Sequence, residues 1–435
     1  MKKLILKPLL AIAVLIAFTG SSFCQEIAKL KVFTAQEAVE SNSTIRINNS
    51  NRTLQIKLWE QNTVKVEFPV PDTLAKGMTE KNWQEVTGSK ISKFHSRMDI
   101  VINGLSIGAG AGKNYSYNRD DALNNLMQNT LINEVATGTQ TGKVITSQLG
   151  GWTEDISKLK PLIQPGNIIT YQQWGTGTGF LIPVTIYLPS NASIELVNKY
   201  SGVQISGNIK KSYFNLTNTV LDVENAGNVR ITSKFCTLNF GVIGECEADI
   251  SNSTFRADAI KKMEIESTRS TVEYRIGDSI YIRSNLDNSY TIEEINVAEG
   301  RLLHSNVKLE KLNKKVDFDG NNYDLKIRQI SPDAALIKIN NSWADMRLPV
   351  RGLSNYTVNF DGKNCAVFAP FEIVPEKREE PEAAKPGLVF SMGETYLKNS
   401  QRPNVPRYFK ASFGSASGIP TRFEITCQQC IVDFK

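Results

Sequence analysis

Histidine, long apolar runs and clustered positive charge are all scarce in this sequence, and each shortage argues against a class of function. The 435 residues contain two histidines, His95 and His304. Neither lies in a zinc-binding motif or a nucleophile elbow, so no Ser–His–Asp triad is indicated. Beyond the N-terminal segment no 18-residue apolar run occurs, and we therefore expect no transmembrane helix in the mature chain.

The net charge of the chain is also small. The formal net charge is +6, which falls to +3 without Lys2, Lys3 and Lys7 of the N-terminal segment. Nucleic-acid binding needs a concentrated basic face, and the sequence offers none. We therefore expect no nucleic-acid partner.

The N-terminus has the pattern of a secretory signal peptide over residues 1–24. Its three lysines precede an apolar stretch, Leu9 to Phe18, that is too short to anchor the chain in a bilayer. Cleavage before Gln25 predicts an extracytoplasmic protein in the periplasm, at the outer membrane or on the cell surface. The alternative is a lipoprotein with lipidated Cys24, although bulky Phe23 precedes that cysteine.

Cysteine is infrequent, and its count is odd in the mature chain. Five cysteines remain after residue 24: Cys236, Cys246, Cys365, Cys427 and Cys430. Export permits disulfides, but an odd count leaves at least one thiol outside any pair. The CQQC sequence at Cys427 and Cys430 predicts either a local disulfide or a pair of packed thiols at the end of the solenoid. A thioredoxin-like redox pair would stand at a helix N-terminus, whereas a strand pattern precedes this one.

A small polar marker recurs every 16 to 21 residues and separates short runs of alternating apolar residues. The markers are Asn198, Asn215, Lys234, Asn252, Thr268, Asn285, Asn306, Asn322 and Asn341. A repeat of this length is typical of one coil of a β-solenoid. We therefore predict an all-β fold, a single elongated β-solenoid or β-helix-like stack of successive short strands with a long polar insertion.

A single coil cannot be stable alone, because ordering its backbone costs more than its few buried side chains contribute. The ends of the stack must be capped against edge-to-edge pairing.

We divide the chain into segments in this order: signal peptide 1–24, N-terminal β-strands 25–103, polar Gly/Asn-rich insertion 104–179 with one short helix near 120–135, solenoid coils 180–374, charged loop or linker 375–387, and C-terminal strands 388–435.

Two stretches resemble the bacterial putative-adhesin family of exported β-strand-repeat proteins, a family of unknown function. TLQIKLWEQNTVKVEF at residues 53–68 resembles its first strand pair. FLIPVTIYLPSNASIELVNKYSGVQISGNI at residues 180–209 resembles its strand–Pro–coil step around a Ser-Gly-Val turn. The resemblance implies a β-solenoid at the envelope or cell surface, and it implies no catalytic residue.

Motifs that carry chemistry are weak. GAGAGK at residues 108–113 lacks the first glycine of a phosphate-binding loop and has Asn114 in place of the metal-binding hydroxyl. Acidic residues of the coils, such as Asp222 and Glu264, alternate with Lys and Arg, as on a solvated face. Trp152 and Trp174 lie in the polar insertion, where they are the candidate ligand contacts.

The sequence therefore predicts a non-enzymatic exported solenoid that acts as a cell-envelope scaffold or adhesion-like module. We expect no cofactor, no metal site, and a partner that is an envelope, glycan or protein surface. The alternative is a glycan-binding or glycan-cleaving solenoid that uses the insertion. A weaker third hypothesis is a redox-linked envelope protein that uses Cys427 and Cys430.

Overall fold

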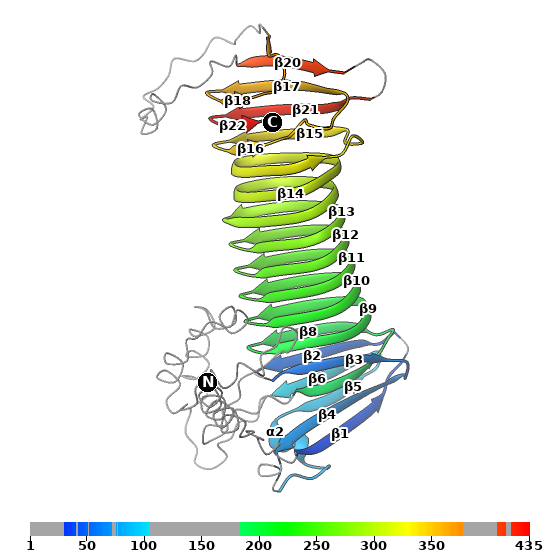
Figure 1. Cartoon of the computed structure of the whole chain (residues 1–435). Coiled ribbons are helices and arrows are strands. Elements are labelled where there is room, and N and C mark those ends of the chain that lie inside the picture. The colour runs from blue at the N-terminus through cyan, green and yellow to red at the C-terminus, as the bar shows by residue number, and fades with distance from the viewer. Residues whose placement is uncertain are drawn as a thin grey trace, which may run out of the picture.

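The computed structural model describes residues 30–40, 42–50, 52–71, 75, 77–103, 183–376, 407–414 and 419–435. Within these residues, 22 strands form one continuous sheet that winds into an elongated column (Figure 1). The predicted all-β, solenoid-like stack is confirmed. In this part of the chain no helix has the length and apolar character needed to cross a bilayer.

Parallel strands of nearly equal length build the middle of the column. They are β9 (Gly202–Thr217), β10 (Val220–Lys234), β11 (Thr237–Ser251), β12 (Thr254–Thr268) and β13 (Thr271–Leu286), and β14 (Asn288–Ile330) continues them over 43 residues. In β10 to β12 each residue lies opposite the residue 17 positions later, as in Leu221 opposite Leu238. Each of these strands is therefore one coil stacked on the next.

Breaks in the period-2 alternation bend each strand around the interior. In β10, Leu221 and Val223 are buried, but two residues that are not buried follow before Ala226, and two more before Val229. Each extra residue changes the direction in which the next side chain points, because successive side chains lie on opposite faces of a strand. The strand turns twice and keeps its apolar side chains on the inside.

A left-handed residue closes each coil at one corner. These residues have φ between 45° and 59°: Tyr200, Asn218, Phe235, Asn252, Arg269, Asp287, His304, Asn322, Trp343, Asn364 and Gln429. The sequence markers lie within three residues of these corners, but Asn252 and Asn322 alone among them coincide with one. The markers therefore repeat with the period of the coils and lie near their corners.

The residue after each corner points inward, and in several coils it is a small polar residue. Ser253 Oγ accepts a hydrogen bond from the Cys236 amide at 3.0 Å, and Ser270 Oγ accepts one from the Ser253 amide at 3.2 Å. Asn288 Oδ1 accepts a hydrogen bond from the Ser270 amide at 2.9 Å. This ladder satisfies buried amides that the tight corner removes from the strand pairing.

The remaining strands lie toward the two ends of the column. At the N-terminal end they are β1 (Leu30–Ala38), β2 (Thr44–Ser50), β3 (Leu54–Trp59), β4 (Thr63–Pro71), β5 (Lys90–Phe94), β6 (Arg97–Asn103), β7 (Val184–Pro189) and β8 (Ser193–Lys199). At the C-terminal end they are β15 (Leu336–Ser342), β16 (Asp345–Arg347), β17 (Tyr356–Lys363), β18 (Ala366–Phe368), β19 (Val374–Pro375), β20 (Tyr408–Phe413), β21 (Thr421–Gln428) and β22 (Ile431–Asp433).

Coils do not stack in chain order at either end, in contrast to the regular succession that the sequence predicts. Near the N-terminus, β2 lies between β6 and β8, and β3 lies between β7 and β9. Near the C-terminus, β21 lies between β15 and β17, and β22 lies between β16 and β18. We call residues 421–433 the intercalated coil, because later chain inserts between two earlier coils (Figure 1).

Antiparallel strands cover both ends. β4 pairs antiparallel with β1 and β7, and β5 with β6; at the other end β20 pairs antiparallel with β17 and β19. A short helix, α2 (Trp83–Thr87), adds a buried indole between Phe33 and Phe68, with ring centroids 6.3 and 5.3 Å away. These elements supply the caps that an open parallel stack needs.

Candidate functional site

A groove with a volume of about 540 Å³ opens on the outer side of the coils in the N-terminal half of the column. Its lining comes from β2, β8, β9, β10, β11 and β12, so it runs along the axis of the column. We call it the charged groove, after the ionisable residues that it contains. These are Glu195, Lys211, Tyr213, Arg230, Glu245, Glu247, Lys262 and Glu264.

Ionisable side chains form lateral rows in this groove because equivalent positions of successive coils lie side by side; Arg230 lies opposite Glu247, and Glu247 lies opposite Glu264. Arg230 Nη2 lies 2.6 Å from Glu247 Oε2, and Glu195 Oε2 lies 3.2 Å from Nε of Arg46, a residue beside the groove lining. The side chains of Arg230 and Glu247 are more than half exposed, and exposed ion pairs contribute about 0–1 kcal/mol each. These ionic groups add little to the stability of the fold. Because they are exposed, they are available to a polar partner.

The groove has a sequence signal that pattern analysis along single strands misses. Residues 17 positions apart carry opposite charge at Arg230 and Glu247, and again at Arg256 and Glu273, where Nε and Oε2 are 2.9 Å apart. Because the coil repeat is 17 residues there, such pairs are lateral neighbours in the stack.

Acidic residues of the coils have polar partners, both those named from the sequence and others. Asp258 lies 3.7 Å from Arg275, Glu264 pairs with Arg283, and Glu266 accepts a hydrogen bond from Asn285 at 2.9 Å. Asp222 accepts one from Asn239 at 2.7 Å, while burial raises the pKa of its carboxyl group. This pattern fits laddered side chains on a solvated face.

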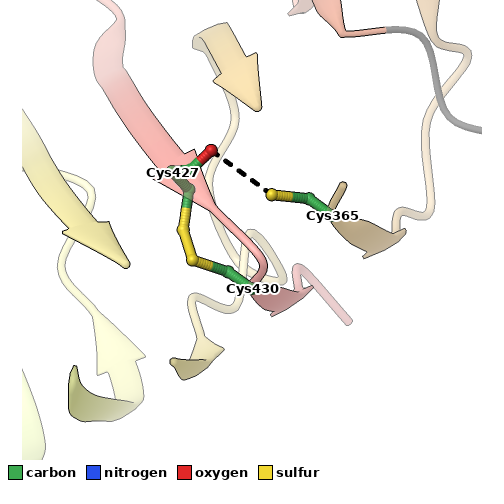
Figure 2. Close-up of side chains that lie close together, drawn as sticks. All are labelled: Cys365, Cys427 and Cys430. Carbon is green, nitrogen blue, oxygen red and sulfur yellow. Dashed lines mark hydrogen bonds between the residues drawn. A yellow bond between two sulfur atoms is a disulfide. The ribbon is translucent and has the colours of Figure 1, made fainter. Parts of the chain in front are cut away.

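Three cysteines meet near the C-terminal end of the column, and we call them the cysteine cluster (Figure 2). A disulfide joins Cys427 and Cys430, whose Cα atoms are 6.1 Å apart. Sγ of the Cys365 thiol lies 3.4 Å from the Cys427 carbonyl oxygen and 3.5 Å from the Lys363 carbonyl oxygen, so its one S–H group can donate to either acceptor. The three sulfur atoms lie within 4.8 Å of one another.

Intercalation brings this cluster together. Cys365 follows the left-handed Asn364, and Cys430 follows the left-handed Gln429, so both occupy the inward corner position of their coils. The Gln429 amide donates to the Lys363 carbonyl at 2.8 Å, which aligns the two corners. The sequence pattern singled out Cys427 and Cys430 but not Cys365, because Cys365 lies 62 positions before Cys427 in the chain.

The cluster combines one disulfide with one adjacent thiol. Cys427 and Cys430 are 4% and 1% exposed, whereas Cys365 is only half-buried. The disulfide lies at a strand-to-strand corner between β21 and β22 rather than at a helix N-terminus, so no helix dipole acts on it. The arrangement supplies the two reactants of thiol–disulfide exchange.

The other two thiols differ from this cluster. Cys236 and Cys246 are buried inside the coils, and burial raises the pKa of each thiol to about 12. They stay protonated at neutral pH and pack as small apolar side chains.

Several residues named from the sequence lie elsewhere. Trp152, Trp174, the GAGAGK segment 108–113 and the expected helix near 120–135 lie outside the described residues. His304 is an exposed corner residue whose Nδ1 lies 2.7 Å from Asn322 Nδ2, and His95 is exposed in the turn between β5 and β6.

Comparison with known proteins does not identify the family of this chain. No protein-family model matches the chain, and no curated protein matches it. Among solved structures, the chain matches a crystal structure described as a putative cell adhesion protein from Clostridium sporogenes, at 9% identity and a TM-score of 0.17. The match covers 94% of this chain and 99% of that one, but at this TM-score it supports no conclusion about fold or function.

Proposed function

We propose that this chain is an exported, non-enzymatic scaffold or adhesion-like module of the cell envelope. The charged groove is the observation that carries the proposal, because it is a continuous polar contact surface supported by the stacked strands β8 to β12. Signal-peptide cleavage before Gln25 would deliver the chain to the envelope, and the resemblance of residues 53–68 and 180–209 to the adhesin-like family supports the same location.

The groove suits an extended polar partner. Its ionisable groups come from successive coils, and neighbouring strands of a sheet lie about 4.8 Å apart. Tyr213, 37% exposed, lies opposite Arg230 and provides an aromatic surface beside the charges. An envelope polysaccharide or an extended protein segment, each with hydrogen-bonding groups along its length, is the class of partner that we propose.

Replacing Arg230 and Lys262 together with alanine is expected to weaken binding to purified envelope fractions roughly tenfold, as expected when polar contacts at the centre of an interface are removed. Binding of the full chain would be measured by sedimentation with envelope vesicles and by glycan array. The matched control is Arg256→Ala, which removes an exposed ion pair with Glu273 on a different side of the coils. Wild-type binding by the double variant, with normal folding, would refute the role of the groove.

The glycan-specific alternative uses Trp152 and Trp174 instead. It predicts that Trp174→Ala abolishes glycan-array binding while the groove variant leaves it intact. Release of reducing sugars from a polysaccharide panel by the purified protein would contradict the non-enzymatic proposal.

A further inference from the structure

We propose that Cys365, Cys427 and Cys430 form a thiol–disulfide exchange site in which Cys430 pairs either with Cys427 or with Cys365. The observation that carries this is the proximity of the three sulfur atoms, which all lie within 4.8 Å of one another; one belongs to a thiol and the other two are joined in a disulfide. The proposal does not depend on the charged groove or on its partner.

The geometry of stacked corners suits the second pairing. Lys363 lies opposite Gln428 and Ala366 lies opposite Ile431, so the corner residues between them are lateral neighbours. Neighbouring strands are about 4.8 Å apart, within the Cα–Cα range of about 4.4–6.8 Å that a disulfide spans. Cys365 and Cys430 also share the inward corner position, so their side chains start from equivalent backbone conformations.

The exchange step balances within the chain. Cys365 Sγ loses its proton to water, and the thiolate electron pair forms a bond to Cys430 Sγ. The Cys427–Cys430 bond breaks, its electron pair stays on Cys427 Sγ, and that sulfur takes up a proton. One disulfide and one thiol exist before and after, so no external oxidant or reductant is consumed.

The two isomers differ in what they connect. The Cys427–Cys430 bond closes a local loop inside the intercalated coil. A Cys365–Cys430 bond would join the intercalated coil covalently to the coil that contains β17 and β18, across the break in chain order. The site would then switch the C-terminal end of the column between a non-covalent and a covalently stapled form.

Peptide mapping separates the isomers cleanly. Trypsin cuts after Lys363, Lys377 and Arg422, which puts Cys365 in peptide 364–377 and leaves Cys427 and Cys430 together in peptide 423–435. The local disulfide therefore gives no cross-link, whereas the exchanged disulfide joins the two peptides. The full chain would be held in a glutathione redox buffer, quenched with acid, alkylated and digested without reduction.

Cys427→Ser is the decisive variant. We expect most molecules to show the cross-linked peptide pair, because Cys430 then has one neighbouring thiol held beside it. Cys365→Ser should give no cross-link, and Cys236→Ser, a buried thiol outside the cluster, should behave as the wild type. Alkylation of both Cys365 and Cys430 in natively folded Cys427→Ser would overturn the proposal.

Wild-type protein provides a second readout that does not depend on the folding of a variant. Incubation at pH 8 should raise the cross-linked fraction at least about tenfold over protein kept at pH 4, since the thiolate is the attacking species. Complete absence of the cross-linked pair at pH 8 would also refute the exchange.

Discussion

Replacing Phe423 with alanine is expected to lower the free energy of unfolding by about 3–5 kcal/mol, the usual cost of truncating a fully buried phenylalanine. Phe423 is 0% exposed and lies between Ile337 of β15 and Val358 of β17. Its ring contacts Tyr356 and Phe434 at centroid distances of 6.2 and 5.9 Å. Truncation would leave a cavity where the intercalated coil contacts both neighbours.

Guanidinium unfolding followed by circular dichroism measures this effect. The matched control is Arg422→Ala, one residue earlier on the same strand, whose side chain is 56% exposed. Its effect should stay within about 0.5 kcal/mol, as for most surface substitutions. Equal stability of the two variants would show that Phe423 is not enclosed between the two earlier coils.

Alkaline pH is expected to destabilise the column strongly. Burial raises the pKa of the Cys236 and Cys246 thiols and of the Tyr290 phenol to about 12 each. In the unfolded chain these groups ionise near 8.5 and 10. The folded state therefore binds their protons more tightly, and its stability falls as the pH rises above the unfolded pKa toward the folded one.

The expected loss is about 3 kcal/mol for each of the two thiols by pH 11, at about 1.4 kcal/mol for each unit between the folded and unfolded pKa. Denaturant unfolding at pH 8, 9.5 and 11 would measure it. Substitution of both Cys236 and Cys246 by alanine should remove most of the loss below pH 10, where the tyrosines of the unfolded chain remain largely protonated. A flat stability between pH 8 and pH 11 would contradict the buried state of these side chains.

Apolar alternation predicted the coils because a residue that faces the interior must be apolar in almost every coil. Leu221 and Val223 form one short alternating apolar run and Val229 and Ile231 form the next, and all four side chains are buried. The corners were harder to place. Asn is typical of left-handed backbone, but Phe235 and other large residues also adopt it here, so composition alone does not mark the position.

Intercalation could not be predicted from periodicity. A parallel ladder pairs backbone groups, and apolar side chains such as Phe423, Ile337 and Val358 stack equally well on any apolar neighbour. Chain order was therefore the default expectation, and it was wrong at both ends. The cysteine cluster follows from the same rearrangement, which explains why Cys365 carried no signal of its own.

Amide hydrogen exchange of the native protein, resolved by peptide, tests the account most directly. If residues 421–433 lie between two earlier coils, their backbone amides should be protected as strongly as those of β15 and β17, with all three exchanging in one cooperative opening. Rapid exchange of 421–433 while β15 and β17 remain protected would contradict the intercalated stack.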